Sequence, residues 1–80
     1  MKASRWYKEF GGGREERYYH ITEIEEGRAV SGRVYVYNSL FRKVMTEEPR
    51  RFDDKWWMEQ EINNAVHEVA EKSVPFLMNF

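Results

Sequence analysis

The chain contains two histidines, and proton transfer or metal binding would have to begin with these side chains. His67-Glu68-Val69-Ala70-Glu71 has half of a zinc-binding helix motif, but Glu71 stands where the second histidine is needed. We therefore expect His67 to be a solvated residue, opposite the apolar side of its helix. His20 lies between Tyr19 and Ile21, and we expect it to be partly buried and bonded to a backbone group or a tyrosine hydroxyl. The sequence predicts no metal site and no cofactor.

Other residues that carry chemistry are not spaced as in common catalytic sites. None of the four serines lies in a Gly-x-Ser-x-Gly turn, and the chain has no cysteine. The glycine triplet at 11–13 lacks the Lys-Ser/Thr pair of a phosphate-binding loop. Carboxylate pairs occur at Glu15-Glu16, Glu25-Glu26, Glu47-Glu48 and Asp53-Asp54. All four pairs lie at expected turns or element ends, whereas hydrolysis needs recessed carboxylates with different pKa values. We therefore predict a non-enzymatic protein without catalytic residues.

The elements that would position a functional surface begin with three strands. Aromatic and β-branched residues dominate at about 5–10, 17–24 and 28–37, and the glycine triplet and Glu26-Gly27 provide the turns between them. Residues 34–37, Val-Tyr-Val-Tyr, have no polar side, which indicates a strand covered on both faces. These segments predict a three-stranded antiparallel meander.

The segment after Asn38 fits two structures. Apolar residues at 40, 41, 44 and 45 recur at helical spacing, and Ser39 and Pro49 are suitable helix ends. This pattern favours a short helix at about 39–47. The competing interpretation makes Asn38-Ser39 a hairpin turn and 40–45 a fourth strand.

The clearest periodic pattern predicts a long helix from Asp53 to about Lys72. Carboxylates at its start and a lysine at its end suit the helix dipole. Apolar residues at 58, 62, 65, 66 and 69 form one stripe, which should lie on the sheet. Pro75 ends the regular structure within an apolar C-terminal tail, residues 74–80. The predicted architecture is α+β, with one domain over residues 1–80: the meander packs against one long C-terminal helix, with a short helix or fourth strand between them.

Two tryptophans are not explained by this core. On a helical wheel Trp56 and Trp57 point away from the apolar stripe, beside two arginines. Exposed indoles next to arginine are typical of protein-binding hot spots, and the acidic outer face of the helix would fit a basic groove. The predicted partner-binding residues are Arg50, Arg51, Trp56, Trp57, Glu59 and Glu61.

Nucleic-acid binding is an alternative, because arginines and tyrosines are interleaved along the predicted strands. Residues 1–52 hold eleven basic and eight acidic side chains, a net charge of +3, whereas residues 53–72 hold two and six, a net charge of −4. The overall charge of −1 disfavours phosphate binding. The residues of this alternative are Arg14, Arg17, Arg28, Arg33, Tyr35 and Tyr37.

We interpret the chain as a non-enzymatic protein-binding module, with a small inhibitor of a larger host protein as its narrower form. Small inhibitors encoded by phages and mobile elements, anti-CRISPR proteins among them, are alike in size and charge; no motif here aligns with any family. A third interpretation is a structural or assembly protein whose tail joins two copies, although burial of the tail against its own chain is favoured. No apolar run reaches 18 residues and no apolar segment follows the basic N-terminus, so we expect no membrane span and a cytoplasmic location.

Overall fold

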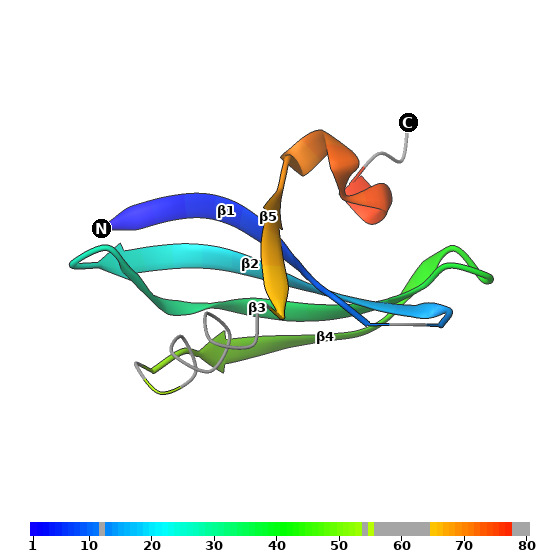
Figure 1. The fold of residues 1–80 in the computed structure, drawn as a ribbon, viewed down its shortest axis with the longest axis horizontal. Helices are drawn as coiled ribbons and strands as arrows, with labels where there is room; N and C mark the ends of the chain where they lie inside the picture. Colours follow the sequence, from blue (N-terminus) through cyan, green and yellow to red (C-terminus); the bar gives the residue numbers. More distant parts are fainter. Residues whose placement is uncertain (12, 54, 56–64, 78–80) are drawn as a thin grey trace.

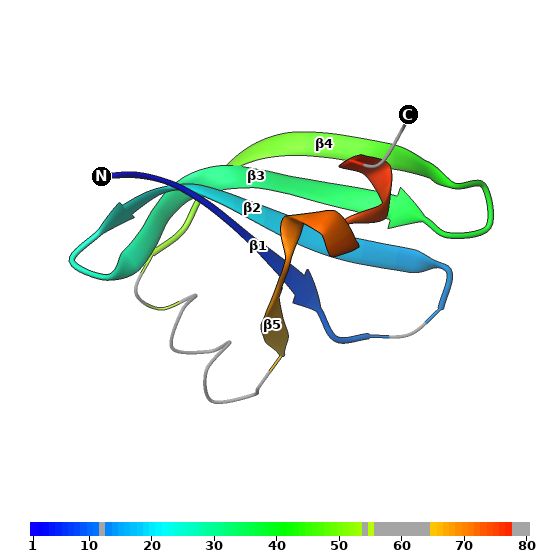
Figure 2. The ribbon, with the colours of Figure 1, turned by 90° about the horizontal axis from the view of Figure 1, so that it is seen from above.

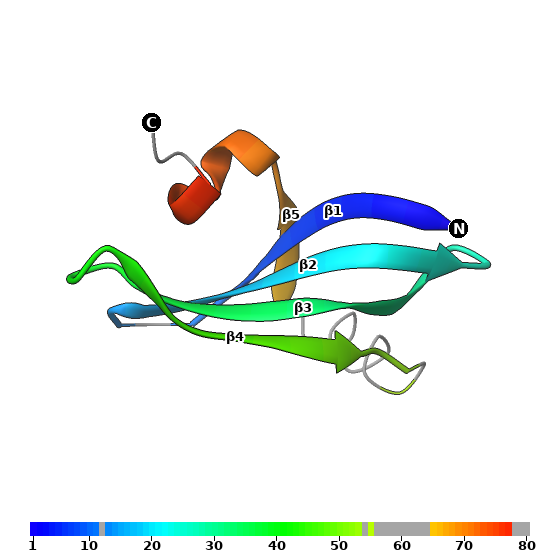
Figure 3. The same cartoon turned by 180° about the vertical axis from the view of Figure 1, so that it is seen from behind.

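The computed structural model describes residues 1–11, 13–53, 55 and 65–77 of the 80-residue chain. These residues form a five-stranded antiparallel sheet with the strand order β4-β3-β2-β1-β5 (Figure 1). The strands are β1 (Lys2–Glu9), β2 (Glu15–Glu25), β3 (Arg28–Asn38), β4 (Lys43–Arg51) and β5 (Val66–Val69). Two 3-10 turns follow, η1 (Glu71–Ser73) and η2 (Pro75–Leu77). Strands β1 to β4 are neighbours in chain order, whereas β5 returns from the C-terminal part of the chain to pair with β1 (Figure 3).

The first three strands lie where the sequence predicts them. They pair antiparallel, and the β2–β3 hairpin closes through Glu26 and Gly27, both with positive φ. Glycine adopts such a φ at little cost, which explains why Gly27 ends the turn. β3 lies between β2 and β4, with buried clusters on both faces, in agreement with its lack of a polar side.

The predicted short helix at 39–47 is wrong. Residues 39–42 form a turn and Lys43–Arg51 form strand β4, so the fourth-strand alternative holds, with its strand displaced toward the C-terminus. The apolar spacing suggested a helix, but these residues do not share one buried face. Leu40 and Phe41 lie exposed in the turn, whereas Val44 packs beside Tyr37. Helical spacing over so few residues also fits a turn followed by a strand.

Pro49 marks β4 as an edge strand rather than the end of a helix. The backbone N–H of Phe52 donates to the carbonyl of Val30 at 3.0 Å, and pairing continues in register to Arg33↔Pro49. Hydrogen-bonded and non-hydrogen-bonded pairs alternate along an antiparallel ladder, so the Pro49 nitrogen faces away from β3. Proline is tolerated in a sheet at such a position because no ladder bond is lost there.

The described residues between 65 and 72 contradict the predicted long C-terminal helix. Val66–Val69 form β5 and Glu71–Ser73 form η1, while residues 56–64 lie outside the described residues. A helix would place Val66 and Val69 on one side, but the strand directs them to opposite faces, where each joins a different cluster. The described elements include no α-helix, so the α+β class and the helix-covered meander are wrong for this part of the chain.

The sheet carries a buried cluster on each face, because neighbouring residues of a strand point to opposite sides. Tyr19 and Tyr18, adjacent in β2, belong to different clusters. We call the first the Tyr19 cluster; it consists of Tyr19, Ile21, Ile24, Ala29 and Phe52. We call the second the Trp6 cluster; it consists of Trp6, Tyr18, Tyr37 and Val74. The segment with η1 and η2 arches over the face of the Trp6 cluster (Figure 2).

Candidate functional site

The hairpin between β3 and β4 has a turn that is fixed by side-chain hydrogen bonds. The Asn38 Oδ1 accepts from the backbone N–H groups of Leu40 and Phe41, both at 2.9 Å. Ser39 joins the turn to the β1–β2 loop, because its N–H and its hydroxyl both donate to the carbonyl of Arg14, at 2.7 and 3.2 Å. The conformation of the tip is therefore determined by local sequence, since asparagine and serine bond readily to nearby backbone.

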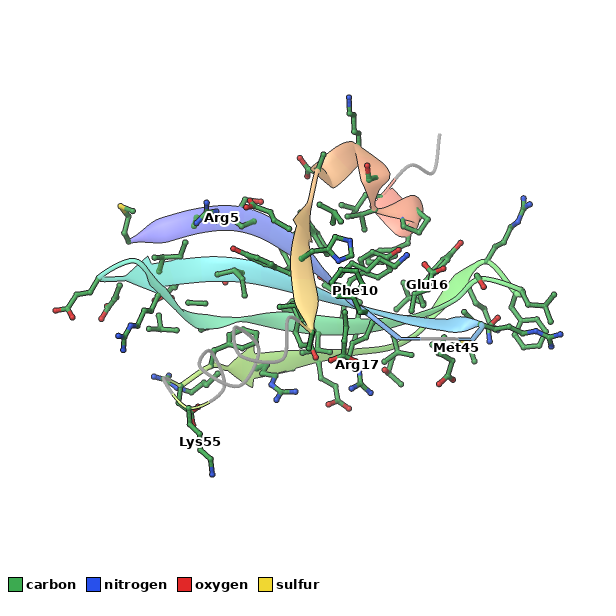
Figure 4. All side chains as sticks on the ribbon, viewed as in Figure 1. Arg5, Phe10, Glu16, Arg17, Met45 and Lys55 are labelled. Atoms are coloured by element: carbon green, nitrogen blue, oxygen red, sulfur yellow. The ribbon has the colours of Figure 1, made fainter. Side chains whose placement is uncertain are left out.

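Large apolar side chains of this hairpin extend into solvent. Leu40 is 57% exposed, Phe41 63% and Met45 45%. Met45 has no Cα partner on β3, since the register shifts between Val36 and Tyr37, and it lies near the turn end of β4 (Figure 4). Single exposed apolar residues are ordinary, but three on one braced hairpin are typical of a contact surface.

Basic side chains surround these apolar residues. Arg14, Arg42 and Lys43 are exposed, and none forms an ion pair with a residue that the structure describes. Glu15, opposite Asn38 in the β2–β3 pair, adds one carboxylate at the same end of the sheet. We define the hairpin-tip surface as Leu40, Phe41, Arg42, Lys43 and Met45. Its apolar centre and positive rim match the usual composition of a protein contact.

The predicted partner-binding residues are only partly placed. Arg50 and Arg51 are exposed at the end of β4, and the Arg50 guanidinium lies 5.9 Å from the centre of the Phe52 ring. The remaining four, Trp56, Trp57, Glu59 and Glu61, lie outside the described residues. The sequence interpretation missed the hairpin-tip surface because it assigned Leu40, Phe41 and Met45 to the apolar stripe of a short helix.

The arginines proposed for nucleic acid do not gather on one face. Arg17 and Arg33 lie on opposite faces of the sheet, because they occupy β2 and β3 positions of opposite alternation. Each pairs with a carboxylate: Arg17 Nη1 lies 3.6 Å from Glu9 Oε2, and Arg33 Nε lies 3.0 Å from Glu47 Oε1.

The remaining residues of that alternative are also separated. Arg14 lies in the β1–β2 loop and Arg28 at the start of β3, at opposite ends of the β2–β3 pair. Tyr35 and Tyr37 share a face, but both rings contact the Phe76 ring of the tail. The described residues therefore offer no open row of tyrosine and arginine for stacking with bases.

The histidines have partners that the sequence did not predict. His20 is partly buried as expected. Its Nε2 lies 2.9 Å from the Ser4 hydroxyl, so its partner is neither a backbone group nor a tyrosine. His67 lies in β5 and stacks on Phe10 with 4.3 Å between ring centroids, so its expected place on a solvated helix face is wrong. Pairing between distant strands created both contacts, and a single sequence carries no signal for it.

The Ser4–His20 pair contains the first elements of a nucleophilic site. Burial lowers the pKa of His20, while the Glu71 carboxylate opposes that shift, so the imidazole is neutral at pH 7 and can accept a proton. A serine nucleophile also needs a group that orients the base and donors for an oxyanion. Among described residues, His20 makes no second hydrogen bond, and Ser4 is exposed.

Depressions on the described surface are shallow. One of them is lined by Thr22, Ser31, Gly32, Arg33, Pro49, Arg50 and Arg51. No group of three histidine, aspartate or glutamate side chains within the described ranges could hold a metal ion. No helix in that part of the chain is long and apolar enough to cross a membrane.

Comparison of the chain with protein-family models, with curated proteins and with solved structures gives no match. The functional argument therefore depends on the geometry of the molecule itself.

Proposed function

We propose that the chain is a non-enzymatic protein-binding module that contacts its partner through the hairpin-tip surface. The observation that carries this proposal is the exposure of Leu40, Phe41 and Met45 on a hairpin whose turn is held in place by hydrogen bonds. A braced turn loses little conformational freedom on binding, so most of the free energy from apolar burial remains available for affinity.

The apolar centre of the hairpin-tip surface is small, so its basic rim must also contribute to the free energy of binding. Burying one such side chain is worth about 1.5–3 kcal/mol, so Leu40 and Phe41 together supply about 3–6 kcal/mol before the cost of association. That alone gives weak binding. Arg42 and Lys43, which form no ion pair with a described residue, favour a partner with an apolar pocket and an acidic rim, because complementary charge speeds association and selects the partner.

Inhibition of the bound protein is the narrower form of the same proposal, and we place it in the cytoplasm because a chain without cysteine needs no oxidising compartment. Contacts among the described residues support neither nucleic-acid binding nor assembly through the tail. Tyr35 and Tyr37 are covered by Phe76, and the described part of the tail packs on its own sheet.

Photo-crosslinking tests the proposal. The full chain with Phe41 replaced by benzoylphenylalanine is irradiated in lysate of the producing cells, and we expect one stoichiometric protein adduct. The matched control carries the probe in place of Phe10, which is 54% exposed outside this surface. Adding Leu40→Ser and Met45→Ser should reduce the adduct from position 41 at least tenfold. Equal adducts from both positions, a nuclease-sensitive adduct or no adduct would contradict the proposal.

A further inference from the structure

The ring of Phe76 lies in a basin formed by four aromatic side chains. Its centroid is 5.0 Å from that of Tyr35, 5.4 Å from Tyr18, 5.7 Å from Tyr37 and 5.8 Å from Trp6. The rings of Tyr18 and Trp6 meet the Phe76 ring edge to face. The ring planes of Tyr35 and Tyr37 are tilted from that of Phe76 by 33° and 34°. We define the aromatic basin as Trp6, Tyr18, Tyr35 and Tyr37.

The segment that fills the basin is attached by side chains alone. Within residues 71–77 the described backbone bonds are local: Val74 N–H donates to Glu71 and Leu77 N–H to Val74. No hydrogen bond or ion pair links residues 71–77 with the sheet in the described part of the chain. Burial of Val74, which is fully covered, and of Phe76 holds the segment in place. It can therefore leave the basin without breaking a bond to the sheet.

One polar group of the basin is left unsatisfied by this segment. The indole Nε1 of Trp6 is buried, and no hydrogen-bond acceptor among the described residues reaches it. The Tyr18 hydroxyl, in contrast, donates to Glu16 Oε1 at 2.7 Å. A buried donor without an acceptor is costly, so a ligand that offers an oxygen to Trp6 Nε1 has an advantage over the chain's own segment.

We propose that the aromatic basin is a binding site for a peptide segment of a partner protein. An aromatic side chain of that peptide takes the place of Phe76, and a carbonyl or carboxylate oxygen of the peptide accepts from Trp6 Nε1. The chain's own segment indicates the class of peptide, because Val74 fills the position next to Phe76 in the same cluster. We therefore expect the peptide to carry an apolar residue two positions before its aromatic one. The chain's own segment then acts as a competitor that keeps the basin closed. This site is separate from the hairpin-tip surface, so the two proposals stand or fall independently.

The test uses the full chain with Phe76→Ala and a fluorescein-labelled peptide, Ser-Val-Pro-Phe-Leu, which copies residues 73–77. We expect saturable binding by fluorescence anisotropy, at least tenfold weaker binding to the unaltered chain, and none for the peptide with Ala in place of Phe. The additional substitution Tyr35→Ala should abolish binding. If Phe76→Ala does not fold by circular dichroism, Phe76→Leu replaces it, because leucine still fills part of the basin.

A second measurement follows the indole N–H resonance of Trp6, which Trp6→Phe identifies by its loss. The peptide ends in a free carboxylate after its leucine, an oxygen that the chain's own segment lacks, so peptide binding should move this resonance downfield, as a new hydrogen bond requires. Equal binding of both peptides, or no binding to a folded Phe76 variant, would overturn the proposal. Concentration-dependent dimers of the unaltered chain that disappear with Phe76→Ala would also overturn it, because a second copy would then be the occupant.

Discussion

The indole of Trp6 and the imidazole of His20 lie face to face, with their centroids 4.1 Å apart and their planes within 4° of parallel. The two residues are directly opposite in the β1–β2 pair. Phe76 contacts Trp6 on the covered part of this face, and Ser4 reaches His20 on its open part. The stacked Trp6–His20 pair thus lies between the aromatic basin and the exposed Ser4.

Acid titration should reveal His20 as a source of pH-dependent stability. Burial lowers the pKa of His20 below its ordinary 6.5, so the unfolded chain binds the proton more tightly than the folded chain. As the pH falls below about 6.5, the free energy of unfolding should decrease, and this contribution should level off below the folded pKa. Urea midpoints measured from pH 7.5 downward check this. His20→Phe keeps a ring on Trp6 and retains His67, so its profile should be flatter; identical profiles would contradict the argument.

Alkaline conditions should destabilise the fold through Tyr19. Burial raises the pKa of Tyr19 to about 12, the hydrogen bond to Glu9 adds to the shift, and Arg17 opposes it. The folded chain keeps the phenol proton that the unfolded chain releases near pH 10, so stability present below pH 10 is lost as the pH rises through about 12. Tyrosinate absorbance and unfolding midpoints are the measurements. Tyr19→Phe should lose less stability than the unaltered chain between these pH values, and an equal loss in both would refute the role of Tyr19.

Gly32 is required by close packing of β3 on β2. A β-carbon at this position would overlap the carbonyl oxygen of His20 and lie 3.1 Å from the Ile21 Cα. Since these are backbone atoms of the central strand pair, the strands would have to move apart. We expect Gly32→Ala to lower the free energy of unfolding by about 1–3 kcal/mol in urea. Ser31→Ala, one residue earlier, is the control and should change it by less than about 0.5 kcal/mol.

Pro49 should protect the outer edge of β4 from self-association. Its nitrogen faces away from β3, so Pro49→Val would place a free N–H on the open edge of the sheet. We expect concentration-dependent sedimentation for this variant, with thermal stability nearly unchanged. Glu48→Val, whose N–H is directed toward β3, is the control for added hydrophobicity. Equal association of both variants would show that the effect comes from hydrophobicity and not from the exposed N–H.

Local signals predicted the part of the fold that local interactions determine. The Glu26-Gly27 turn and the aromatic strands on either side of it could be located because turn chemistry and side-chain type act over a few residues. The pairing of β5 with β1 brings Val69 opposite Trp6, across more than sixty positions of sequence. Nothing near Val69 indicates that the open edge of β1 needs a partner, so its spacing from Val66 was interpreted as helical.

The candidate surface shows the same limit. Arg50 and Arg51 were predicted to lie at a contact surface, and the structure places them exposed on β4. Leu40, Phe41 and Met45 were instead assigned to the apolar stripe of a short helix, because their spacing fits a helical period. Leu40 and Phe41 are exposed in a turn that the hydrogen bonds of Asn38 and Ser39 hold in place, and Met45 lies at the register shift of β4.

The position of β1 between β2 and β5 also has a consequence for synthesis on the ribosome. β1 is synthesised before residues 66–77, which pair with its outer side and cover its tryptophan. Until that segment has been synthesised, the nascent chain presents an open strand edge beside exposed rings, which makes it vulnerable to aggregation.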